Sequence, residues 1–183
     1  MHDSLIRWIA EQFPHVVGLA MLPFERTMHE EFCIDVGWPV CREDWYPETC
    51  FEVRFEEIGR RLVAVYDDSE FGVGIGLYVV GEEHSFDERC LSSLAEFDEA
   101  FRSTLASVEP HLQCAAITGC YHCQRDDHEY KYAYWQFPDA FMTLVQHFEG
   151  DGHAGNDSSL DIRLVPRFGA ARLTFPLKTN ILF

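Results

Sequence analysis

The sequence has few basic side chains and almost no lysine. Its 183 residues include 14 Lys and Arg against 31 Asp and Glu, so the formal net charge is −17, and only Lys131 and Lys178 are lysines. Binding to nucleic-acid phosphates or docking on an anionic membrane requires a basic surface. We therefore expect neither nucleic acid nor a membrane as a partner.

Hydrophobic segments long enough for membrane insertion or export are also missing. No apolar stretch approaches the roughly 20 residues that span a bilayer, and the opening Met1-His2-Asp3-Ser4 lacks the apolar core of a signal peptide. The seven cysteines are odd in number and irregularly spaced, which argues against a disulfide framework. These features predict a cytoplasmic protein with reduced thiols.

Recognisable catalytic motifs are absent as well. Gly72, Gly74 and Gly76 alternate within a predicted strand, whereas a phosphate-binding glycine loop lies between a strand and a helix. The sequence has no Gly-x-Ser-x-Gly motif, and with 31 acids close carboxylate pairs are expected by chance. We therefore predict no catalytic residue and no cofactor, and favour a non-enzymatic protein while leaving a dispersed active site open.

Cysteine and histidine concentrate between residues 111 and 128. Cys120 and Cys123 have the Cys-x-x-Cys spacing of a zinc knuckle. Zinc requires converging ligands, but in a continuous strand these two side chains would point to opposite faces. A small enzyme or zinc-stabilised domain is therefore the alternative interpretation, and we assign no metal ligand. The other members of the group are His111, Cys114, His122 and His128.

The periodicity of the hydrophobic residues predicts one α+β domain over residues 1–183. Hydrophobic residues make up 47% of the chain, as in ordinary globular domains. Runs of strands interrupted by isolated helices indicate a largely antiparallel sheet, with a mixed sheet left open, and about three helices packed on it. The predicted helices cover 4–13, 93–108 and 138–148, and the predicted strands cover 15–22, 32–36, 51–55, 62–66, 73–79, 114–121, 129–137, 160–165 and 171–175.

Proline, serine and glycine define several of these boundaries. Pro14 is expected to end the first helix, and Pro138 to begin the third. Ser93 is expected to cap the second helix, with Glu96 three residues later. We expect residues 50–67 to form a hairpin with Gly59 in its turn.

Two predicted strand faces have an unusual composition. The alternating glycines of residues 72–76 would let a helix or a large aromatic ring approach closely. Tyr130, Tyr132 and Tyr134 are spaced by two residues, so we expect them on one face. A packed core face explains this tyrosine row better than a contact surface.

The negative charge is unevenly distributed. Residues 1–110 hold 23 acids and 8 bases, whereas residues 111–183 hold 8 acids and 6 bases. A strongly negative region accelerates encounter with a basic protein, although acidity also serves solubility alone.

From this charge we predict an acidic protein-binding module that neutralises a basic partner. A bacterial immunity or inhibitor protein that blocks a toxin such as a nuclease would have this character. Its carboxylates would occupy the basic cleft of the partner, and neighbouring aromatic rings would supply buried anchors. The sequence predicts no oligomeric state. The candidate partner-binding residues are Glu43, Asp44, Trp45, Asp67, Asp68, Glu70, Glu82 and Glu83.

Overall fold

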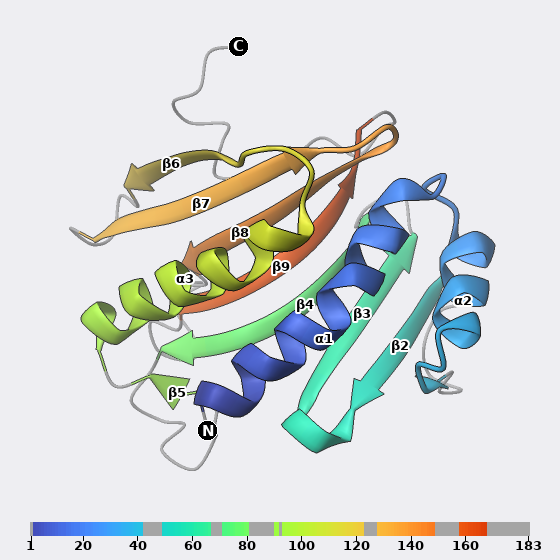
Figure 1. The fold of residues 1–183 in the computed structure, drawn as a ribbon, viewed down its shortest axis with the longest axis horizontal. Helices are drawn as coiled ribbons and strands as arrows, with labels where there is room; N and C mark the ends of the chain where they lie inside the picture. The colour runs from blue at the N-terminus through green and yellow to red at the C-terminus, as the bar shows by residue number, and fades with distance from the viewer. Residues whose placement is uncertain are drawn as a thin grey trace.

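Nine strands form one curved sheet in the computed structural model (Figure 1). The strand order is β1-β2-β3-β4-β9-β8-β7-β6, and β5 pairs with β4 off this path. The β4–β5 pair is parallel and every other pair is antiparallel. The prediction of an α+β fold with a largely antiparallel sheet is therefore confirmed, and the parallel β4–β5 pair makes the sheet mixed, the possibility that the sequence left open. The structure describes residues 2–41, 49–66, 71–80, 90–91, 93–122, 128–148 and 158–167.

The described residues contain three α-helices, two at the start of the chain and one between β5 and β6. The helices are α1 His2–Met21, α2 Arg26–Asp35 and α3 Leu94–Val108. The strands are β1 Val40–Cys41, β2 Cys50–Phe55, β3 Arg60–Tyr66, β4 Phe71–Val80, β5 Cys90–Leu91, β6 Ile117–His122, β7 Glu129–Gln136, β8 Ala140–Phe148 and β9 Ser158–Pro166.

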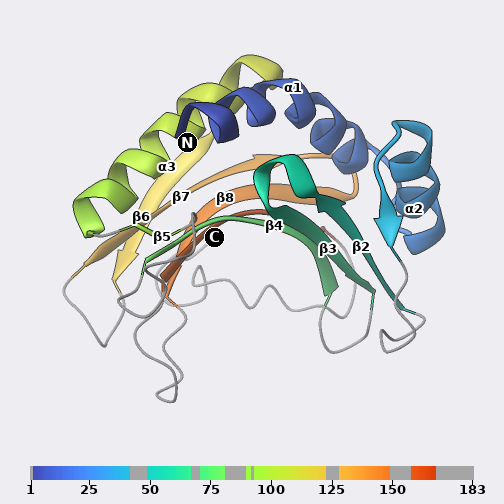
Figure 2. The ribbon, with the colours of Figure 1, turned by 90° about the horizontal axis from the view of Figure 1, so that it is seen from below.

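The helices α1 and α3 cover the convex face of the arched sheet, and α2 lies beside β1 and β2 (Figure 2). The main hydrophobic core fills the space between the two covering helices and the sheet. Phe13 of α1 and Phe97 of α3 pack there against alternate residues of the central strands, such as Ile75 and Ile162. Each such side chain contributes about 1.5–3 kcal/mol through burial.

Several local predictions are confirmed. The hairpin over residues 50–67 consists of β2 and β3, and Gly59 has the left-handed φ of 60° that glycine adopts without strain. The second predicted helix is α3, and the Ser93 hydroxyl caps it by accepting a hydrogen bond from the Glu96 N–H at 3.2 Å.

The first two predicted strands are wrong. Residues 15–22 largely continue α1, and residues 32–36 mostly belong to α2. Pro14 lies inside α1 instead of ending it. The buried stripe of α1 includes Phe13 and Val16, on either side of the proline. We infer that packing of this stripe against the sheet outweighs the roughly 3 kcal/mol cost of an interior proline.

The predicted third helix, residues 138–148, is also wrong, because the chain forms β8 there. This strand lies between β7 and β9 and is buried on both faces, so that the adjacent residues Leu144 and Val145 are both fully buried. A strand of this kind is a continuous apolar run, and its periodicity does not distinguish it from a buried helix. Pro138 lies in the turn before β8.

Other predictions are not tested by the described residues. The strand predicted for residues 171–175 lies outside them, and the assignment of residues 1–183 to a single domain stays a prediction. None of the described helices combines the length and apolar composition needed to cross a membrane. The cytoplasmic location stays a prediction.

Candidate functional site

All eight predicted partner-binding residues lie outside the described residues. They belong to three segments, 42–48, 67–70 and 81–89, each of which joins described strand ends. The pairing of those strand ends fixes where each segment leaves the sheet. The residues concerned are Glu43, Asp44 and Trp45 in the first segment, Asp67, Asp68 and Glu70 in the second, and Glu82 and Glu83 in the third.

Two of these segments join the sheet at the same end. The Tyr66 N–H donates a hydrogen bond to the Thr49 carbonyl at 3.0 Å, and Tyr66 pairs with Phe71. The third segment follows Val80, at the other end of the ten-residue strand β4. At about 3.3 Å per residue, the Tyr66 end and the Val80 end are about 30 Å apart. The eight residues therefore divide into two groups by their attachment to the sheet.

Both ends carry acidic segments. The two segments at the Tyr66 end hold six acids and one base. The Val80 end is joined by segment 81–89 and also by segments 123–127 and 149–157, because Val80 pairs with Ser158 and β7 begins at this end. These three segments hold nine acids and two bases. Negative charge is therefore concentrated in the connections between strands.

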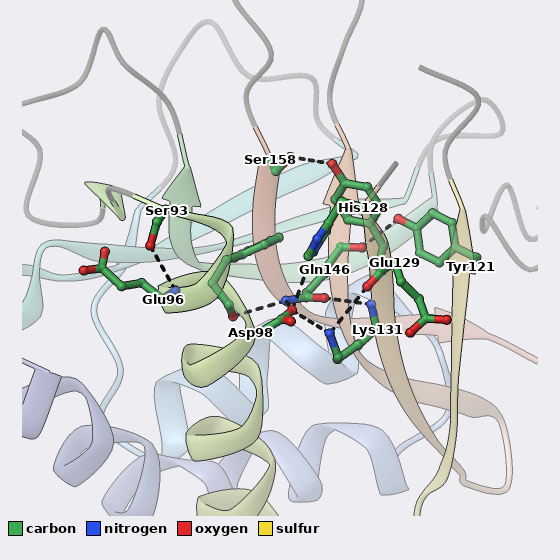
Figure 3. Close-up of polar contacts among 11 residues, drawn as sticks. Ser93, Glu96, Asp98, Tyr121, His128, Glu129, Lys131, Gln146 and Ser158 are labelled. Atoms are coloured by element: carbon green, nitrogen blue, oxygen red, sulfur yellow. Dashed lines mark hydrogen bonds and ion pairs between the residues drawn. The ribbon is translucent and has the colours of Figure 1, made fainter. Parts of the chain in front are cut away.

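A polar network links α3 to β7 and β8 close to the Val80 end (Figure 3). Asp98 of α3 lies at its centre. Its Oδ1 is 2.6 Å from Lys131 Nζ, accepts a hydrogen bond from Gln146 Nε2 at 3.1 Å, and lies 3.5 Å from His128 Nε2. Burial alone would raise the pKa of Asp98, but the hydrogen bonds from Lys131 and Gln146 and the Lys131 charge outweigh burial and lower it. Asp98 is therefore ionised at neutral pH.

Gln146 connects this network to the backbone on both sides. Its side chain is fully buried. Its Oε1 accepts from the Lys131 N–H at 2.7 Å, and its Nε2 also donates to the Phe97 carbonyl at 3.1 Å. The Tyr121 hydroxyl donates to the Gln146 carbonyl at 2.7 Å, which adds the edge strand β6. The network fixes the first turns of α3 and also His128, the residue that follows segment 123–127.

Sequence reasoning missed this network because it placed Gln146 on a helix. The signal that would have revealed it is a single amide inside the apolar run of residues 140–148. A buried amide requires hydrogen-bond partners, so Gln146 predicts polar groups on the elements packed against residues 140–148.

The glycine face of β4 accommodates polar side chains of β9. A Cβ added at Gly76 would lie 3.6 Å from Asp161 Oδ1, and one at Gly74 would lie 3.9 Å from Arg163 Cγ. Within the described part of the chain, α1 and α3 pack on the opposite face, and no helix or aromatic ring lies against these glycines. Asp161 Oδ2 accepts from Arg163 Nη2 at 2.5 Å and from the Ser159 hydroxyl at 3.1 Å.

The tyrosine row does not share one environment. Tyr130 belongs to the main core on the helix-covered side, whereas Tyr132 forms a second small cluster with Val145, against which Tyr134 packs. Because the Lys131 N–H donates to the Gln146 side chain, the described β7–β8 pairing begins only at Tyr132. The unshifted β6–β7 register, in which the three tyrosines pair with every second residue of β6, is the one expected for a single strand face, although their surroundings differ.

A second buried polar group lies where α2 meets the sheet. His29 is fully buried, and its Nδ1 lies 2.5 Å from the Tyr66 hydroxyl. Burial lowers the pKa of His29 to about 4, against an opposing contribution from the Leu19 backbone. Burial also raises the pKa of Tyr66, so the tyrosine hydroxyl donates and the neutral imidazole accepts. Cys33 is buried nearby, and burial followed by the Glu30 charge raises its pKa to about 12, so it is an unreactive thiol.

The cysteine and histidine cluster does not form a metal site within the described part of the chain. No group of three or more His, Cys, Asp or Glu residues there is arranged to hold a metal ion. Cys114 and Cys120 are exposed free thiols, His122 lies 3.8 Å from Glu129, and Cys123 lies outside the described residues.

Comparison of the chain with protein-family models, with curated proteins and with solved structures finds no significant match.

Proposed function

We propose that this protein is an acidic protein-binding module that neutralises a basic protein partner, in the manner of an immunity or inhibitor protein. The supporting observation is the concentration of acids in the segments between strands, six acids against one base at the Tyr66 end alone. Connections carried on a rigid sheet are a common position for binding residues. Their negative field attracts a basic partner before contact.

Within this proposal, the Tyr66 end provides the main contact. Asp67, Asp68 and Glu70 supply carboxylates for the basic cleft of the partner, together with Glu43 and Asp44. Bidentate pairs with arginine would give these carboxylates both strength and orientation.

The remaining candidate residues have different roles. Trp45 is the aromatic anchor beside these carboxylates, because desolvated aromatic rings contribute much of the binding energy in protein interfaces. Glu82 and Glu83 belong to the Val80 end. Because the segment that contains them attaches at the opposite end of β4 from the main contact, they act by long-range attraction of the partner.

The test compares two variants that remove the same charge. The partner is captured from a lysate of the source cells, identified and purified, and its association rate is measured at about 20 mM and about 300 mM salt. The triple variant Asp67→Asn, Asp68→Asn, Glu70→Gln should associate at least about tenfold more slowly at low salt. The control variant Glu31→Gln, Asp35→Asn, Glu109→Gln changes exposed helical or near-helical acids and should stay within about twofold of the unmodified protein.

Three results would contradict the proposal. The two variants could slow association equally, which would assign the effect to total charge and leave solubility as the role of the acids. The captured partner could keep its activity when saturated with this protein. Finally, the lysate could yield no basic protein whose binding weakens as salt rises.

A further inference from the structure

The strand β6 is an unprotected edge of the sheet. It is the last strand in the order, and among the described residues no strand pairs with its outer side. Natural sheets protect such edges with short strands, proline or charged side chains, because a free edge pairs with other strands. The opposite edge strand, β1, has two residues and follows Pro39. In contrast, β6 has six residues and none of these protections.

The exposed side chains of β6 include no Asp, Glu, Lys or Arg, and the exposed His122 lies 3.8 Å from Glu129 of β7. Ile117 is 56% exposed, and Thr118 and Cys120 are also exposed. The 15 residues from Pro110 to Gln124 include no Asp, Glu, Lys or Arg, although 25% of the chain is charged. Charge depletion on an exposed surface is typical of the centre of a protein interface.

Contacts with the neighbouring strands hold β6 extended. The ring of Tyr132 lies across Gly119, where an added Cβ would come within 2.3 Å of the tyrosine hydroxyl. The Tyr121 hydroxyl binds the Gln146 carbonyl at 2.7 Å. A strand that is already ordered loses little conformational entropy when it pairs.

We propose that β6 pairs antiparallel with β6 of a second copy of this chain, so that two sheets become continuous across a two-fold axis near Cys120. A two-fold interface presents the same residues from both copies, and an uncharged strand produces no like-charge contact with itself. The strand β6 itself offers no carboxylate to a basic partner, and the neighbouring carboxylate of Glu129 lies 3.8 Å from His122, which argues for a second copy as the occupant.

The sheet order supports this choice of edge. Strands β1 to β4, which carry the acidic segments of the Tyr66 end, lie on the side of the sheet away from β6. Seven strand spacings of about 4.8 Å separate β1 from β6, a distance well beyond the Debye length of about 8 Å at physiological salt. The dimer therefore places the attachment points of the acidic segments 42–48 and 67–70 of each copy away from the junction between the copies.

The experiment measures mass against concentration by sedimentation equilibrium. We expect a reversible species of twice 21.2 kDa, with dissociation on the order of micromolar for an interface this small. The variant Thr118→Glu, Cys120→Glu places like charges across the axis and should weaken the dimer at least about tenfold. The control variant Ala10→Glu, Ala106→Glu adds the same charge at exposed helical positions and should leave the dimer within about twofold.

Cross-linking with a short bis-maleimide tests the position of the axis. Cys120 side chains near the axis should give a covalent dimer that Cys120→Ser abolishes and Cys114→Ser keeps. Thermal unfolding of each variant shows whether the fold is retained, and the cysteine variants keep the test valid if the Glu variant unfolds.

A monomer at all concentrations would overturn the proposal. So would a dimer that the Thr118 and Cys120 changes leave intact, or a Glu control that dissociates it equally. This dimer does not depend on the proposed partner, so its failure would leave the association-rate test unaffected.

Discussion

His29 is fully buried where α2 meets the sheet, although a charged imidazole is costly to bury. The cost is avoided because the side chain is neutral: its pKa is about 4, and Nδ1 accepts the Tyr66 hydroxyl hydrogen bond. The Phe24 ring packs edge-on against the His29 ring, with 5.0 Å between the two ring centroids. The contact between α2 and the end of β3 therefore depends on the protonation state of one residue.

Stability should therefore fall as the pH falls below about 6.5. The unfolded chain takes up a proton on His29 near its ordinary pKa of 6.5, whereas the native state resists protonation until about pH 4. The stability that depends on a neutral His29 is fully present above pH 6.5 and is lost between pH 6.5 and 4. By pH 5 the free energy of unfolding has fallen by about 2 kcal/mol. Urea unfolding from pH 7.5 to 5 should show a steeper decline for the unmodified protein than for His29→Gln. Equal slopes for both proteins would contradict this assignment.

At the scale of elements, the number of buried faces decided which predictions were confirmed. The strand β2 alternates apolar and charged residue types, and α3 has one apolar stripe, so each has a periodicity that the sequence displays. In β8 both faces are buried, and this periodicity disappears. The prediction for α1 failed for another reason. The prediction that Pro14 ends the helix considers only the local cost of proline, whereas the contacts that offset this cost come from packing against the sheet.

The close contact between Gly119 of the edge strand β6 and the Tyr132 ring provides a test by substitution. Gly119→Ala should destabilise the protein by roughly 1–3 kcal/mol, because the new methyl group would collide with the buried Tyr132 ring. Gly74→Ala is the matched control, since its Cβ would lie 3.9 Å from the nearest atom and should be tolerated. Thermal unfolding measures both variants, and equal melting temperatures for the two would show that Tyr132 moves freely.

At the scale of the whole molecule, the sequence indicated the distribution of charge but not its division between two ends of the sheet. That division depends on the register of β4 with β3 and β9, which no local pattern contains. The sequence predicts the eight candidate residues as one set, whereas the two ends of the sheet at which their segments attach are about 30 Å apart. The Asp98 network joins residues from three elements, and its detection required β8 to be recognised as a strand.

A net charge of −17 should make the fold itself sensitive to salt. Repulsion among the acids destabilises the compact state, and salt screens it. Raising salt from about 20 mM to about 300 mM should therefore raise the melting temperature at pH 7.5. The triple variant at Asp67, Asp68 and Glu70 should show a smaller rise. A melting temperature that falls with salt would instead indicate that ion pairs such as Asp98–Lys131 dominate.

The strand order also has a consequence for the folding pathway. From β1 to β4, and again from β6 to β9, each strand pairs with the next along the chain, so each half forms from contacts close in sequence. Between the two halves of the sheet, the described strand pairing is that of β4 with β9, for instance at Val73 and Leu164, and α1 and α3 also contact β8. Loop-closure entropy makes such a distant pairing slow, so we expect the junction of the halves to limit the folding rate. A chain cut near the exposed Gln113, between α3 and β6, would keep every local strand pairing within one fragment, and the two fragments would reassemble through the β4–β9 pairing and the contacts of α1 with β8 and of α3 with β7 and β8.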